Sequence, residues 1–206
     1  MSLTFRIALA APDQDLVSIL TAAEEPLATL GFRRERSFLR VEPERSDEEQ
    51  TWEKVEVRSL AVDGQKLAGW NGVSVWWRRP KIEFAIKLFR WSDHLVNVYV
   101  SIDEHVLSHL FVQGVDTFYS ALAILGAACK AVGGIGRLDL PIDRLRPDEV
   151  EPRFLGDPCL LGLFAVAAYS REQVEKLAAD EYTVHELPGF WLLVDSDYVE
   201  ISRKYA

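Results

Sequence analysis

Three residues near the middle of the chain have side chains that can bind a metal ion: Glu104, His105 and His109. Two histidines four positions apart can share one helix face and hold a metal, the arrangement that zinc peptidases use. Here the glutamate precedes the first histidine instead of following it, and the segment lies where a predicted strand gives way to a predicted helix. Local hydrogen bonding at this junction is the interpretation that we favour. A small metal-dependent hydrolase that uses these three residues is the alternative function.

No other segment predicts catalysis. Cys129 and Cys159 stand in apolar stretches, where the pKa of a thiol rises instead of falling. Gly133, Gly134 and Gly136 follow a predicted helix, whereas glycines that cradle a phosphate lie between a strand and the start of a helix. We interpret the glycines as a helix stop. We expect no catalytic residue, no cofactor and two buried free thiols, with a single disulfide as the alternative.

Tryptophans beside charged residues suggest binding, because exposed aromatic side chains rimmed by charge dominate the energy of protein interfaces. Trp76 and Trp77 are adjacent in a predicted strand, so they point to opposite faces and one leaves the core face. Trp70 lies in a predicted glycine turn, and Trp52 lies in the most polar stretch, residues 42–54. The alternative is that a helix covers the second face of the sheet and both adjacent tryptophans are core residues. The residues expected to contact a partner are Glu42, Glu44, Asp47, Glu48, Glu49, Trp52, Glu53, Trp70 and Trp76.

Charge narrows the class of partner. The 206 residues include 23 basic and 32 acidic side chains, a net charge of -9. This balance disfavours nucleic acid and suits a basic protein partner, although an acidic chain can also reflect solubility alone. The N-terminal sequence lacks the pattern of a secretory signal, and no apolar stretch is long enough to cross a bilayer. We therefore expect a cytoplasmic protein that binds neither nucleic acid nor a membrane.

Hydrophobic periodicity predicts an α+β fold: a mainly antiparallel sheet with a central apolar helix and shorter helices packed on it, in a single domain of residues 1–206. The central helix spans residues 115–132. A second helix begins after Asp13, and a third follows Ser170, which forms a capping box with Gln173. Residues 141–154 are expected to be a connection. The predicted strands are 3–10, 32–41, 55–62 followed by a hairpin turn at Asp63-Gly64, 72–78, 82–91, 95–102, 135–140, 160–168, 182–187, 190–194 and 198–202.

The C-terminal part resembles a known family. An apolar strand leads to Tyr169-Ser170 at the start of a short helix, and a strand, a turn and the sequence FWLLVDSD follow. This order is similar to that of the immunity proteins encoded beside bacterial polymorphic toxins, in particular the immunity protein 52 type. That family often has Trp-Leu-Thr before the Tyr-Leu-Ser segment, where this chain has Leu163-Phe-Ala-Val166.

The resemblance implies a non-enzymatic immunity protein that binds a cognate toxin in the cytoplasm and occludes its active site. Many such toxins are basic, and an acidic antagonist associates faster with a basic partner. The acidic stretch and the exposed tryptophans would then form the contact. A third function class stays open: an adaptor or structural module with another partner, or a homodimer formed through an edge strand.

Overall fold

The computed structural model of the protein describes residues 4–41, 52–91, 94–103, 115–140 and 144–196. The strands are β1 (Thr4–Pro12), β2 (Arg33–Val41), β3 (Trp52–Glu56), β4 (Gly72–Arg79), β5 (Ile82–Trp91), β6 (Leu95–Asp103), β7 (Gly133–Leu138), β8 (Leu161–Ala165), β9 (Tyr182–Leu187) and β10 (Phe190–Asp195). The helices are α1 (Leu16–Thr29), α2 (Leu60–Asp63), α4 (Val115–Ala128), α5 (Val150–Gly156) and α6 (Arg171–Ala178), with short 3₁₀ turns η1 (Gly64–Leu67) and η2 (Pro147–Glu149).

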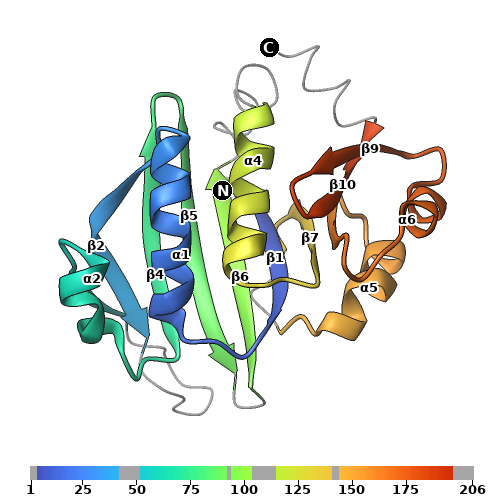
Figure 1. Ribbon diagram of the computed structural model, residues 1–206. Coiled ribbons are helices and arrows are strands. Elements are labelled where there is room, and N and C mark those ends of the chain that lie inside the picture. Colours follow the sequence, from blue (N-terminus) through green and yellow to red (C-terminus); the bar gives the residue numbers. More distant parts are fainter. Residues whose placement is uncertain (1–3, 42–51, 92–93, 104–114, 141–143, 197–206) are drawn as a thin grey trace.

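Within the described part of the chain, ten strands form one sheet in the order β3-β2-β4-β5-β6-β1-β7-β8-β10-β9. Every neighbouring pair is antiparallel. The first strand of the chain, β1, lies in the interior of this sheet between β6 and β7 (Figure 1). The predicted α+β fold with a mainly antiparallel sheet is confirmed.

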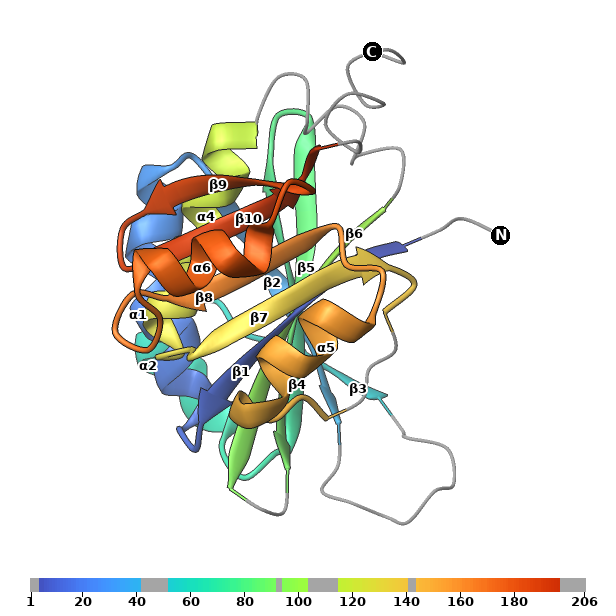
Figure 2. The same ribbon diagram turned by 90° about the vertical axis from the view of Figure 1, so that its right-hand side faces the viewer.

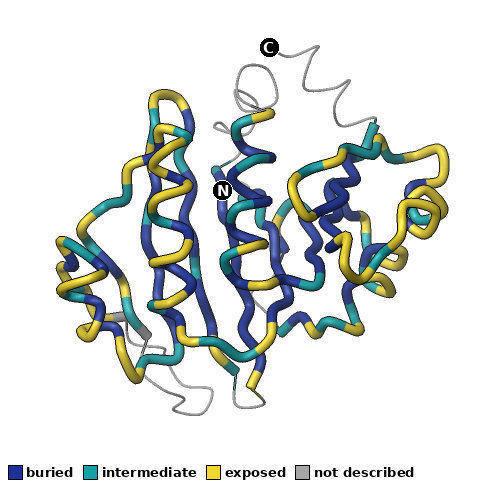
Figure 3. Tube along the Cα trace, in the orientation of Figure 1, coloured by how far each residue is buried: buried dark blue, intermediate teal, exposed yellow. Residues whose placement is uncertain are grey.

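Helices cover the sheet on both sides but over different strands. Helices α1 and α4 lie side by side on one face, where Leu20 and Leu122 join a core with the alternating apolar residues of β1, β4, β5 and β6 (Figure 1). Helices α5 and α6 lie on the other face (Figure 2), where Phe154 and Val174 pack in a second core. The strands inside the sheet are buried along most of their length, whereas the edge strands β3 and β9, the strand β2 next to β3, and the outer sides of the helices are half-buried or exposed (Figure 3).

The central helix is shorter than predicted, because the glycines after it belong to a strand. Helix α4 ends at Ala128, and Lys130 adopts a positive φ of 53°. Gly133 and Gly134 then open β7. A Cβ atom on Gly134 would lie 2.5 Å from the carbonyl oxygen of Ala8 in the neighbouring strand. The interpretation of these glycines as a helix stop was wrong: close packing of the sheet requires them.

Two other predictions are corrected. The predicted strand at 55–62 ends at Glu56, and helix α2 follows it. The backbone N–H of Asp63 donates a hydrogen bond to the carbonyl oxygen of Ser59 at 2.8 Å, which closes a helical turn where a hairpin turn was expected. The predicted connection at 141–154 contains η2 and α5, whose buried Val150 and Phe154 stand four positions apart. The predicted last strand, 198–202, lies outside the described residues.

A buried amide fixes the connection that precedes α5 to the sheet. Asn97 on β6 is fully buried and donates hydrogen bonds to the carbonyl oxygens of Leu9 at 3.2 Å and Leu145 at 2.8 Å. Its side-chain oxygen accepts from the Leu145 N–H at 3.1 Å and from the indole N–H of Trp91 at 2.7 Å. All four hydrogen-bonding positions of the amide are therefore used.

Candidate functional site: the open face of the sheet

Part of the predicted contact lies outside the described residues. This part comprises five acidic residues, which join the end of β2 to the start of β3 in the chain: Glu42, Glu44, Asp47, Glu48 and Glu49. The side chain of Trp52 also lies outside the described part. The three residues of the metal-site alternative, Glu104, His105 and His109, fall in another such segment. Among the residues that are described, no group of three or more His, Cys, Asp and Glu side chains could hold a metal ion.

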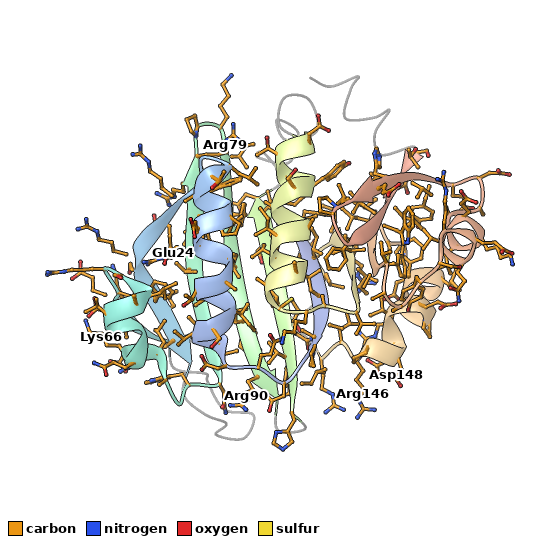
Figure 4. The ribbon with its side chains drawn as sticks, in the orientation of Figure 1. Glu24, Lys66, Arg79, Arg90, Arg146 and Asp148 are labelled. Carbon is orange, nitrogen blue, oxygen red and sulfur yellow. The ribbon has the colours of Figure 1, made fainter. Side chains whose placement is uncertain are left out.

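Two predicted contact residues, Glu53 and Trp70, both contact Arg40, which the sequence analysis did not select. The guanidinium of Arg40 stacks on the half-buried ring of Trp70, 3.9 Å from its centroid. The same group contacts the carboxylate of Glu53, with Nη2 2.6 Å from Oε2, and donates to the backbone oxygen of Lys66 at 2.9 Å. Arg40, Glu53 and Trp70, here named the Trp70 cluster, lie at the end of the sheet where Figure 4 labels Lys66.

The adjacent tryptophans separate as predicted. Trp77 is 1% exposed and packs in the core beneath α1, while Trp76 is only half-buried and points to the opposite face. The alternative in which both belong to the core is wrong. Arg40 pairs in register with Val73, which faces the α1 core, so the Trp70 cluster and Trp76 lie on opposite sides of the sheet. A single flat contact cannot include both.

The face around Trp76, formed by the sides of β2, β3, β4 and β5 that point away from α1, is here named the open face. The second core draws residues from β1, β5, β6, β7, β8 and β10, but among the described residues it includes none from β2, β3 or β4. Figure 2 shows α5 in front of β1 and β7, and α6 in front of β8 and β10. Leu39 on β2 is accordingly 39% exposed. The open face is a sheet surface that carries apolar and aromatic groups without a covering helix in the described chain.

Ion pairs border Trp76 on one side. The guanidinium of Arg78 lies 2.9 Å from the carboxylate of Glu35 and 3.0 Å from that of Glu83. The same guanidinium carbon lies 6.0 Å from the centroid of the Trp76 ring. Trp76 thus has the surroundings of an interface residue: an aromatic side chain with a charged rim.

A half-buried lysine borders Trp76 on the other side. Lys87 on β5 lies directly opposite Ser74 on β4 and Tyr99 on β6. Burial lowers the pKa of Lys87, and the nearby Arg6 guanidinium lowers it further. Within the described residues, no hydrogen-bond acceptor or carboxylate contacts its ammonium group. The sequence analysis did not select Lys87, because a lysine between apolar neighbours in a strand usually faces solvent.

An open hollow of about 700 Å³ lies at the outer end of this face, lined by Glu35, Arg36, Ser37, Lys54 and Glu56. It coincides with a shift in the pairing of β2 with β4 between Arg34 and Phe38. Such bulges bend a strand and redirect its side chains. The hollow therefore gives the β2–β3 end of the open face a concave outline.

The described thiols are not placed for nucleophilic chemistry. Both cysteines are free and buried, as expected from the sequence. Burial raises the pKa of Cys129 to about 12 and that of Cys159 to about 11, so both stay protonated near neutral pH.

No helix in the described chain combines the length and the apolar character needed to span a membrane.

Comparison with known proteins gives a weak structural similarity. No protein-family model matches the chain, and no curated protein matches its sequence. Among solved structures, the Pseudomonas aeruginosa T6SS protein PA0821 is similar over 93% of this chain and 68% of its own, with 12% sequence identity and a TM-score of 0.47. We base no conclusion about fold or function on a likeness of this size.

Proposed function

We propose that this chain is a non-enzymatic immunity protein that binds a cognate bacterial toxin in the cytoplasm and occludes its active site. The observation that carries the proposal is the open face, where half-buried Trp76 and exposed Leu39 lie on a sheet surface that no described helix covers. Surfaces of this kind, apolar in the middle and charged at the rim, are typical of protein interfaces. The resemblance of the C-terminal strand–helix–strand–strand segment to immunity proteins gives the proposal its class.

In this proposal, the predicted contact residues on the two sides of the sheet have different roles. Trp76 on the open face is the proposed anchor, because a desolvated aromatic residue supplies much of the energy of an interface. In the chain, the segment from Glu42 to Glu49 connects β2 to β3, the strands that carry Arg40 and Glu53 of the Trp70 cluster. In this proposal the segment and the cluster steer a basic partner toward the interface, which raises the association rate more than the affinity.

Co-expression with the polypeptide encoded by the adjacent reading frame tests the proposal. We expect the neighbour to arrest growth when expressed alone and to be harmless when this chain is co-expressed. A chain carrying Trp76→Ala should protect poorly and bind at least tenfold more weakly, since a hot-spot truncation costs about 2 kcal/mol or more. The matched control is Leu155→Ala, which removes a 63% exposed apolar side chain on α5, away from the open face.

The same experiment separates the competing classes. If the neighbour is harmless alone, the immunity proposal loses its basis. Stoichiometric zinc in the purified protein, lost on substitution of His105 and His109, would favour the metal-dependent hydrolase. Equal protection by Trp76→Ala and the wild type would move the contact away from the open face.

A further inference from the structure

Two lysines share one row of side chains that crosses the open face, although the chain as a whole is acidic. Strand pairing places Lys54, Leu39, Ser74, Lys87 and Tyr99 side by side in one row across β3, β2, β4, β5 and β6. Residues directly opposite each other in neighbouring antiparallel strands point to the same face. Lys54 and Lys87 therefore lie on the same surface with an exposed leucine and a small serine between them.

The adjacent row adds a tryptophan and an arginine to these two lysines. Trp76, Ala85, Ser101 and Arg6 lie side by side across β4, β5, β6 and β1. The guanidinium of Arg6 donates to the hydroxyl of Ser101 at 3.3 Å and to the backbone oxygen of Leu140. Lys54, Lys87 and Arg6 are here named the basic strip.

Three carboxylates near the basic strip are engaged by other cations. Glu35 and Glu83 both contact Arg78, and Asp157 lies 3.3 Å from Arg137, which is opposite Arg6 on β7. Lys87 is the member of the strip that is half-buried and has no acceptor among the described residues. A partly desolvated ammonium without an acceptor is unfavourable in the free protein, and a bound carboxylate would relieve that cost.

We propose that Lys87 receives a carboxylate side chain of the protein partner, whose apolar stem packs between Trp76 and Leu39 on the open face. This inference rests on the proposed function and specifies the chemistry of its contact. Ser74 is 5% exposed, so the larger side chains of Leu39, Trp76 and Lys87 around it form the surface that a partner would meet. A partner that is basic overall can present one acidic residue at this position.

The surroundings favour a protein carboxylate over a phosphate. Phosphate sites combine lysine or arginine side chains with free backbone N–H groups, as at helix N-termini. Here the central cation is a lysine within a paired strand, and its neighbours Leu39 and Trp76 provide apolar contact. The net charge of -9 also repels a polyanion at long range.

The first test uses the purified full chain and blocked peptides as probes. Nuclear magnetic resonance of 13C-labelled lysine side chains follows the Lys87 signal, which is assigned with Lys87→Arg. A peptide with glutamate between leucine and tryptophan should shift this signal saturably, whereas the same peptide with glutamine in place of glutamate should not. Lys176, an exposed lysine on α6, serves as the internal control. The proposal is overturned if the glutamate peptide causes no shift, or if inorganic phosphate or a uridine oligonucleotide shifts Lys87 equally.

The second test uses the polypeptide encoded by the adjacent reading frame. Lys87→Met, which keeps the aliphatic stem and removes the charge, should weaken its binding at least tenfold, while Lys176→Met on α6 should leave it unchanged. Thermal unfolding of both variants checks that each is folded. Equal binding by Lys87→Met and the wild type would refute this inference and leave the proposed function intact. Specific peptide binding at Lys87 combined with no binding of the neighbour would refute the proposed function alone.

Discussion

Replacement of Asn97 by leucine should destabilise the protein strongly, because the leucine has similar size and no polar atoms. The change removes four hydrogen bonds, of 2.7, 2.8, 3.1 and 3.2 Å. Two of the abandoned groups are the N–H and the C=O of Leu145, a residue that is 1% exposed. Each buried group left without a partner costs about 1–3 kcal/mol, so these two alone predict a loss of about 2–6 kcal/mol.

Urea unfolding followed by tryptophan fluorescence measures this loss as a fall in the midpoint at constant slope. The matched control is Asn71→Leu, the same change at a half-buried turn position outside the second core, which should alter stability by less than about 0.5 kcal/mol. Asn97→Asp keeps the acceptor for Trp91 and Leu145 but places a carboxylate against two carbonyl oxygens, so it should also destabilise. If Asn97→Leu unfolds within about 1 kcal/mol of the wild type, the connection is not held by this amide.

Three further predictions concern the packing of the sheet and the thiols. Gly134→Ala should lower the free energy of unfolding in urea by about 1–3 kcal/mol, because its Cβ would meet backbone atoms of β1. The control is Gly156→Ala, which should not destabilise the protein because no atom lies within 4 Å of its Cβ. Equal effects of the two changes would contradict the packing argument. Iodoacetamide should label neither cysteine in the native protein and both in concentrated urea, and rapid native labelling would show that the thiols are accessible. Burial raises the pKa of Cys159 to about 11 in the folded protein, whereas an ordinary thiol has a pKa of about 8.5. Between these two values the Cys159 thiol loses its proton only in the unfolded chain, which stabilises the unfolded state. The free energy of unfolding, measured in urea at several pH values, should therefore fall across this alkaline range and be unaffected by this thiol below it.

Alternating apolar residues were sufficient to predict the strands that pack against α1 and α4. In β5, Ile82, Phe84, Ile86 and Leu88 share the core face, as their spacing indicates. The capping box of Ser170 and Gln173 was also predicted, and both of its hydrogen bonds are present. These features depend on residues close in sequence, so the sequence alone contains the information.

Features that depend on distant neighbours were missed. The sheet requires Gly134 because of Ala8 and Leu9, more than 100 residues away in the chain. Helix α5 had a local signal that was overlooked: Pro147 followed by apolar Val150 and Phe154, since proline is common in the first turn of a helix.

The candidate site divides in the same way. Alternation along β4 predicted that Trp76 and Trp77 separate, but not which of them is exposed. Arg40 joins Glu53 to Trp70 only because β2 lies between β3 and β4. Lys87 was selected because of its neighbours in a row across five strands, and these neighbours can be identified only when the order of the strands in the sheet is known.

The interior position of β1 has a consequence for biosynthesis. The nine residues of β1 are synthesised before both neighbours, since β6 begins at Leu95 and β7 begins at Gly133. The apolar β1 segment must therefore wait without either hydrogen-bonding partner until β6 is synthesised, a situation that slows folding and exposes an aggregation-prone strand. Chaperone dependence during translation should be concentrated in this interval.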